Sequence, residues 1–306
     1  MAPGYQGRLF ILAFDHRGSF QKKWFRIEGE PTDEESVRIA DGKQLIFEGL
    51  ERAVSGGPEP ATAGGLVDEQ FGAPNEIPQR IKAGGMKLAM PVEKSGQEEF
   101  DFEYGEGFGD HIERFDPDFT KVLVRYNPDG DAEMNRRQAG RLRELSEWLA
   151  ERERRLLFEL LVPATDEQLA SVDGSSERYD AELRPDLMIR AIVEIQAAGV
   201  ESDVWKIEGL DRSEDCRRVV AQCRSNGRDG VVCVVLGRGA DSDRVDSWLE
   251  SAAAVDGYVG FAIGRSIWGD PLAAFLSGEL AREGAAGQIA DNFLHFLSVY
   301  EDGANR

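Results

Sequence analysis

Short apolar runs alternate with longer amphipathic stretches along the whole chain, and this alternation restricts the fold more than any other feature. The runs with the length of strands are residues 9–14, 65–68, 86–92, 121–125, 156–161, 204–207, 231–236 and 258–263. The stretches with helical periodicity between and after them include residues 33–55, 131–153, 184–198, 213–224, 241–254 and 282–300. Strands that alternate with helices are typical of βαβ units and a parallel sheet.

Eight such repeats in 306 residues predict an α/β chain folded as a (β/α)₈ TIM barrel, which takes about 250 residues. A doubly wound sheet is the alternative. That fold usually has a glycine-rich turn after its first strand, whereas the first run here leads into Asp15-His16-Arg17-Gly18. No linker rich in Pro, Gly or Ser divides the chain. We therefore predict a single domain over residues 1–306, with a frayed tail at 301–306.

The chain is strongly acidic, with 57 Asp and Glu against 36 Lys and Arg and a formal net charge of −21. Such a field repels nucleic acid and anionic membranes, so neither is expected as a partner, and an anionic substrate would need a local cationic pocket. Three scattered cysteines without a CxxC pattern indicate a reducing compartment. With no signal-peptide pattern and no long apolar run, the expected location is cytoplasmic.

Charged residues and glycines gather where the predicted strands end. In a barrel these carboxyl ends meet at the active face. The candidates at these positions are Asp15, His16, Arg17, Asp68, Glu93, Lys94, Lys121, Arg125, Glu159, Lys206, Glu208, Gly237, Arg238, Gly239, Gly264 and Arg265. A barrel with a purely structural role would not need a charged group or a glycine at every strand end.

The alternation of side chains along a strand predicts that Lys121, Glu159 and Lys206 point into the barrel. Burial and a neighbouring cation both favour a neutral lysine. A neutral amine can attack a carbonyl to form a Schiff base, and a carboxylate beside it can move the protons. A structural ion pair of Lys206 with Glu159 or Glu208 explains the position of Lys206 equally well.

The eighth strand leads into Gly264-Arg265 and then Asp270-Pro271, which predicts a helix with Asp270 as N-cap and Pro271 in its first turn. Barrels often bind phosphate with the loops after strands seven and eight and a helix N-terminus. Arg265 and the segment 237–239 are therefore candidates for a phosphate site, although two surface arginines are the alternative. Three scattered histidines do not predict a metal site, and no cofactor is expected.

Several segments of the chain resemble the DUF2090 family, which also occurs fused to the sugar kinases of inositol catabolism, the 5-dehydro-2-deoxygluconokinases. They are LAFDHRGSF, LVDEQFGA, MPVEKSGQEEFDFEYG, KVLVRYNPDGD, FELLVPAT, DVWKIEGLDR, VLGRGA and GFAIGRSIWGDPL. This family is similar to class I tagatose-1,6-bisphosphate aldolases of the LacD type and to sulfofructose-phosphate aldolase. The similarity to the LacD-type enzymes lies mainly at the strand ends.

The LacD-type pattern implies a barrel with Schiff-base chemistry. By this resemblance Lys206 is the Schiff-base lysine, Glu159 moves protons during imine formation, Lys121 depresses the pKa of Lys206 and Asp15 positions a substrate hydroxyl. Arg265 implies a phosphate contact. The chain departs from the family pattern at His16, where the family usually has Gln, and at residues 237–239, where it has a Ser/Gly-rich turn.

The sequence therefore predicts a cytoplasmic lyase of the class I aldolase type that acts in carbohydrate metabolism. The expected partner is a small-molecule sugar phosphate, cleaved to dihydroxyacetone phosphate and an aldehyde. The inositol-pathway context of the resemblance suggests 2-deoxy-5-keto-gluconate 6-phosphate. Tagatose or fructose bisphosphate and sulfofructose phosphate are alternatives, as is a non-catalytic sugar-phosphate-binding regulatory barrel. The resemblance is compatible with a homo-oligomer.

Overall fold

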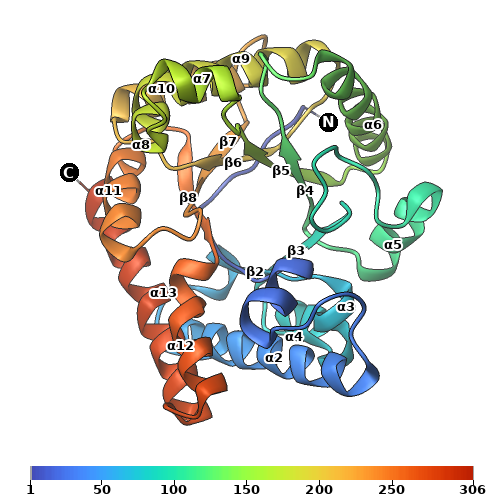
Figure 1. Cartoon of the computed structure of the whole chain (residues 1–306), viewed down its shortest axis with the longest axis vertical. Coiled ribbons are helices and arrows are strands. Elements are labelled where there is room, and N and C mark those ends of the chain that lie inside the picture. Colours follow the sequence, from blue (N-terminus) through green and yellow to red (C-terminus); the bar gives the residue numbers. More distant parts are fainter. Residues whose placement is uncertain (1, 306) are drawn as a thin grey trace.

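Eight parallel strands close into a barrel in the order in which they occur along the chain, and a computed structural model describes residues 2–305 of it (Figure 1). The strands are β1 (Leu9–Ala13), β2 (Ala63–Leu66), β3 (Lys87–Pro91), β4 (Phe119–Arg125), β5 (Arg155–Leu161), β6 (Val204–Glu208), β7 (Val232–Leu236) and β8 (Tyr258–Ile263). Each strand pairs with the next, and β8 returns to β1 with Leu12 opposite Ile263. The barrel prediction is confirmed.

The second strand is shifted from its predicted position. It covers Ala63–Leu66 rather than residues 65–68. Alanine and glycine at its start have no strong strand preference, but this segment pairs with β1 and β3. The chain then leaves the sheet, and Asp68 becomes the N-cap of a short helix by accepting a hydrogen bond from the Phe71 backbone nitrogen at 2.9 Å. Asp68 therefore does not end a strand as expected.

Helices surround the barrel, as the helical periodicity predicts. The α-helices are α1 (Gly18–Phe20), α2 (Asp33–Gly56), α3 (Glu69–Gly72), α4 (Ile77–Ala83), α5 (Phe108–Phe115), α6 (Ala132–Glu151), α7 (Asp166–Ser171), α8 (Ser176–Arg178), α9 (Arg184–Ala197), α10 (Ser213–Cys223), α11 (Ser242–Ala253), α12 (Arg265–Ser277) and α13 (Arg282–Ala304). Two π-helical turns are η1 (Gln21–Phe25) and η5 (Tyr179–Leu183), and three 3₁₀ turns are η2 (Pro60–Thr62), η3 (Ala73–Asn75) and η4 (Gly105–Gly107). Helix α2 begins at a capping box, in which the side chains of Thr32 and Glu35 each accept a hydrogen bond from the other's backbone nitrogen.

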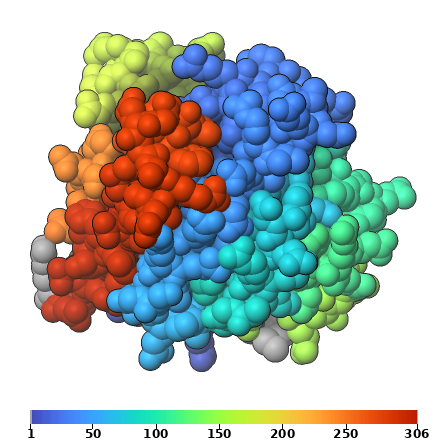
Figure 2. Space-filling view, turned by 90° about the horizontal axis from the view of Figure 1, so that it is seen from below, coloured from blue at the N-terminus to red at the C-terminus, as the bar shows by residue number. Residues whose placement is uncertain are grey.

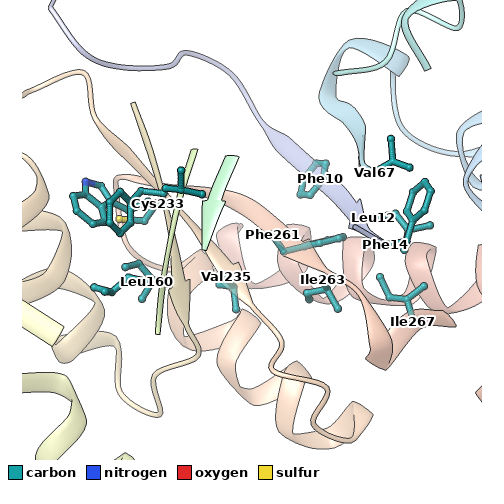
Figure 3. Packing of buried hydrophobic residues seen from close by; sticks show 14 of the residues in the cluster. Phe10, Leu12, Phe14, Val67, Leu160, Cys233, Val235, Phe261, Ile263 and Ile267 are labelled. Carbon is teal, nitrogen blue, oxygen red and sulfur yellow. The ribbon is translucent and has the colours of Figure 1, made fainter. Parts of the chain in front are cut away.

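The strands bury both of their faces. The outward face packs under the helices, where Phe10 of β1 lies against Phe261 of β8 and Leu12 lies opposite Ile263 (Figure 3). The inward face forms a separate apolar layer inside the barrel. That layer contains Leu9, Ile11, Ala13, Leu66, Ala89, Phe119, Leu157, Val204, Val232, Val234 and Ala262. The barrel interior is therefore a packed core below the site, not a channel.

The last helix packs against the first long one and closes the ring of helices (Figure 2). Gly49 of α2 permits this close approach, because a Cβ there would lie 2.3 Å from the Ile289 side chain of α13. Arg282 adds ion pairs to Asp41 and Glu48 of α2. Helix α13 continues to Ala304, beyond the predicted end at residue 300, so residues 301–304 of the tail that was expected to fray are helical. Within residues 2–305, no helix is long and apolar enough to span a bilayer.

Candidate active site

The alternation along each strand places charged side chains directly above the apolar layer inside the barrel. Ala13, Phe119, Leu157 and Val204 belong to that layer. Two residues later in the chain come Asp15, Lys121, Glu159 and Lys206. Because every second residue of a strand faces the same side, these four side chains point inward at the carboxyl end of the barrel. They line one cavity of about 660 Å³.

The Lys121 ammonium holds three carboxylates together. Its Nζ lies 2.8 Å from Asp15 Oδ2, 2.6 Å from Glu93 Oε1 and 3.0 Å from Glu159 Oε2. The lysine is 1% exposed and its three partners are also buried. The contacts to Asp15 and Glu93 are hydrogen bonds, and the contact to Glu159 is an ion pair, so the buried charge of Lys121 is balanced by carboxylates.

Lys206 lies beside Glu159, as the strand register requires. Glu159 of β5 pairs with Lys206 of β6, and the Lys206 Nζ is 3.0 Å from Glu159 Oε2. The same oxygen contacts Lys121, so Glu159 bridges the two lysines. The sequence predicted this group of three, and it predicted the barrel interior as their location.

Within the cluster, the pKa of Lys121 is raised and those of Asp15 and Glu159 are lowered. Burial opposes the charged form of Lys121, but Asp15, Glu159 and Glu93 raise its pKa well above the ordinary value. Burial also opposes the charged forms of Asp15 and Glu159, yet the Lys121 ammonium lowers the pKa of both carboxyls. At neutral pH, Lys121 is therefore a cation and both of these side chains are anions.

For Glu93 and His16, burial shifts the pKa toward the neutral form of the side chain. Burial raises the pKa of Glu93, and its Oε2 is buried without a hydrogen-bond partner among residues 2–305. Burial lowers the pKa of His16 to about 4, assisted by the nearby cations Lys43 and Arg265 and opposed by Asp15. His16 is therefore neutral at pH 7, and it can position a substrate hydroxyl without adding charge.

The loops after β7 and β8 meet at the predicted phosphate site. Arg265 begins α12, directly after Gly264, and its Nη2 donates to the Arg238 carbonyl oxygen at 2.8 Å. Gly239 has a φ of +73°, and a Cβ there would lie 2.9 Å from the Arg265 guanidinium. Arg238 pairs instead with Asp180 at 2.6 Å and with Glu208 at 3.1 Å. Arg265 thus remains available for an anion at a helix N-terminus.

Helix α12 begins earlier than predicted. Gly264 rather than Asp270 is its N-cap residue, and Pro271 lies inside the helix instead of in its first turn. A proline removes the hydrogen bond to the carbonyl four residues before it, which here belongs to Ile267. Asn292 of α13 replaces that bond, because its Nδ2 donates to the Ile267 oxygen at 2.8 Å. Because α12 begins at Arg265, its N-terminus lies at the cavity.

Asp68 lies outside the cavity, contrary to its prediction as a substrate-binding residue. Its Oδ2 is 2.8 Å from the Nζ of Lys43, a fully buried lysine of α2. Lys43 also donates to the backbone oxygens of Phe14 and His16. Asp68 therefore balances the charge of a lysine that fixes the segment after β1.

The other predicted residues lie around the cavity, with the exception of Gly237. Arg17, Glu93, Lys94, Arg125, Glu208, Arg238, Gly239, Gly264 and Arg265 all contribute to its wall. Arg17 is paired with Glu103, and Lys94 with Asp101. A Cβ on Gly237 would face Ile263 and Ser266, in the contact between β8 and α12.

Sequence reasoning missed Lys43 and the segment between β5 and α9. Lys43 occupies a core-facing position of α2, four residues after Ile39 and four before Phe47, and this placement of a charge on the apolar side was the available signal. Tyr179 and Asp180 form part of the cavity wall. No pattern in their irregular segment indicated this. Within residues 2–305, no group of three or more His, Cys, Asp or Glu side chains is arranged to hold a metal.

Comparison with known proteins gives a family and a fold. Residues 3–304 match the profile of a family described as "Uncharacterized protein conserved in bacteria (DUF2090)". No curated protein gives a significant match. Among solved structures, the chain is similar to a fructose-bisphosphate aldolase from Plasmodium falciparum, solved with TRAP and a small-molecule inhibitor. The TM-score is 0.67 at 15% identity, over 96% of this chain and 91% of that chain.

Proposed function

Since the chain belongs to the DUF2090 family and its barrel has the fold of an aldolase, we propose that the protein is a class I aldolase that acts on a phosphorylated keto-sugar or keto-sugar acid. The observation that carries this proposal is the contact of 3.0 Å between the buried Lys206 Nζ and Glu159 Oε2, at the cavity and beside a second lysine. A lysine and a carboxylate within hydrogen-bonding distance are the two groups that imine formation requires.

In the proposed reaction, Glu159 takes a proton from Lys206, and the neutral amine attacks the substrate ketone. Glu159 then returns a proton to the carbinolamine hydroxyl, which leaves as water and gives a protonated imine. The imine accepts the electron pair of the carbon–carbon bond that breaks, while a proton leaves the hydroxyl that becomes the aldehyde. The enamine is reprotonated, and water releases dihydroxyacetone phosphate from Lys206.

The surrounding residues have defined roles in this proposal. Lys121 remains charged, so it fixes Asp15 and Glu159 as anions and orients a hydroxyl. Asp15 accepts the hydrogen bond of a substrate hydroxyl near the breaking bond. Arg265 and the N-terminus of α12 hold the phosphate. The preferred substrate is 2-deoxy-5-keto-gluconate 6-phosphate, with malonic semialdehyde as the second product, and tagatose or fructose bisphosphate follows.

The test is reduction of the enzyme with borohydride in the presence of dihydroxyacetone phosphate, followed by peptide mass spectrometry. We expect one adduct, on Lys206, and Lys206→Ala should lose both the adduct and turnover. Lys82→Ala is a matched control, because Lys82 is half-exposed and pairs with Asp116 away from the cavity. Turnover retained in Lys206→Ala, or an adduct on another lysine, would contradict the proposed mechanism. Binding of sugar phosphates without any cleavage would indicate the regulatory alternative.

A further inference from the structure

The positive charges around the cavity are not all neutralised by acidic side chains. The lysines and arginines in its wall are Arg17, Lys94, Lys121, Arg125, Lys206, Arg238 and Arg265. Five of these form ion pairs. Arg125 and Arg265 are the two that have no acidic partner among residues 2–305. In a chain with a net charge of −21, two unpaired arginines facing one cavity are an arrangement that a ligand can complete.

Arg125 is the last residue of β4 and shares its inward face with Lys121. One of its nitrogens, Nη1, donates to the Gln97 backbone oxygen at 2.6 Å. That bond fixes the guanidinium against the segment after β3, and its other N–H groups have no partner among the residues that the structure describes. The Gln97 side chain adds a second donor group. Its Nε2 is buried without a hydrogen-bond partner in the described part of the chain, and Gln97 also lines the cavity. A buried amide without a partner is costly unless a ligand or water satisfies it.

The two unpaired arginines lie on opposite sides of the barrel. Arg125 ends β4 and Arg265 follows β8, and these strands are four positions apart in a closed barrel of eight (Figure 1). Lys206 is on β6, two strands from each. A substrate bound at both arginines would therefore cross the mouth of the barrel and pass Lys206.

We propose that Arg125 and the Gln97 amide form a second anion site, which binds a carboxylate or phosphate at the end of the substrate opposite to the phosphate at Arg265. This inference rests on the proposed function, and it narrows the substrate class to keto-sugars with an anion at each end. The N–H groups of the Arg125 guanidinium that have no partner among residues 2–305 and the side-chain NH2 group of Gln97 match the oxygens of a terminal carboxylate or phosphate.

The test uses probes that lack a ketone and so bind without chemistry. Two of the probes are 6-phosphogluconate and glucitol 6-phosphate. They differ only at the end opposite to the phosphate, where the first has a carboxylate and the second a hydroxymethyl group. Glucitol 1,6-bisphosphate has a phosphate there. By isothermal titration, we expect the protein to bind at least one doubly anionic probe roughly 10- to 100-fold more tightly than glucitol 6-phosphate. The tighter of the two identifies the anion.

Arg125→Met should remove this preference while leaving the affinity for glucitol 6-phosphate nearly unchanged. Arg217→Met is the matched control. It makes the same charge change on the exposed face of α10, where Arg217 pairs with Glu214, and should keep the preference. Equal affinities for all probes in the unaltered protein, or a preference that survives in Arg125→Met, would overturn the second anion site.

The outcome can be separated from that of the proposed function. Dihydroxyacetone phosphate reaches only the Arg265 end, so borohydride should trap it on Lys206 equally well in Arg125→Met. An adduct on Lys206 without any preference among the probes would refute the second anion site and leave the aldolase proposal standing. A preference that depends on Arg125, without an adduct in the unaltered protein, would refute the aldolase proposal alone.

Discussion

Replacing Lys121 with methionine should destabilise the protein strongly at neutral pH and much less in mild acid. The substitution keeps most of the side-chain volume and removes the one cation that contacts Asp15, Glu93 and Glu159. Glu159 would retain Lys206, and Glu93 already has a raised pKa, but Asp15 would lose its ion pair. Removing one partner of a buried ion pair typically costs about 3–5 kcal/mol.

The magnitude follows from the proton that Asp15 would have to bind. A buried carboxyl without a cation is neutral, and protonating a group with an ordinary pKa of about 3.9 at pH 7 costs about 4 kcal/mol. At pH 5 the same step costs about 1.5 kcal/mol. In the unaltered protein the pKa of Asp15 is lowered, so its contribution to stability is present above the ordinary pKa and is lost as pH falls through the lowered one. In Lys121→Met the pKa is raised instead, so the difference between the two proteins grows with pH.

The measurement is urea unfolding of both proteins at pH 7 and pH 5, with the free energy of unfolding compared at each pH. Lys82→Met serves as control, because its half-exposed ion pair with Asp116 should contribute less than about 1 kcal/mol. A loss in Lys121→Met below about 1 kcal/mol at pH 7, or an equal loss at both pH values, would refute the assignment of Lys121 as the cation that keeps Asp15 ionised.

Three further predictions follow from single contacts. Asp68→Asn should lower the free energy of unfolding by about 3–5 kcal/mol, because Lys43 would lose its buried partner; a changed KM with unchanged stability would instead return Asp68 to the substrate site. His16 has a pKa of about 4 when folded, below its ordinary value, so stability should fall by up to about 3 kcal/mol as pH drops from 6.5 to 4; in His16→Gln this part of the urea pH profile should disappear. Asn292→Leu should cost about 1–3 kcal/mol in thermal or urea unfolding by leaving the Ile267 carbonyl unbonded, and an unchanged stability would contradict that role.

The barrel could be predicted because a local sequence pattern indicates each of its strands and long helices. Each strand is a short apolar run and each long helix has its own periodicity, so eight repeats suffice to indicate the fold. The inward positions of Lys121, Glu159 and Lys206 follow from alternation alone. Two of the three partners of Lys121 could not be predicted, because Asp15 and Glu93 follow strands β1 and β3 and meet Lys121 only when the barrel closes.

The errors have a common physical origin in contacts between distant segments. Asp68 looked like a strand-end ligand because nothing near it in sequence reveals Lys43, which reaches it from the preceding helix. Pro271 looked like the start of a helix because its i−4 carbonyl normally has no other donor. Asn292, 21 residues later in the chain, supplies one and lets the helix begin at Arg265.

The two lysines contact the same oxygen of Glu159, and this has a consequence for how the carboxylate could work. Both ammonium groups contact Oε2, so this oxygen of the Glu159 carboxylate is held in place. While both contacts last, a proton exchanged with a ligand would pass through Oε1, the other oxygen of the same carboxylate. A single substitution that removes a lysine contact to Oε2 should therefore change the orientation of Oε1, even where Glu159 keeps its charge.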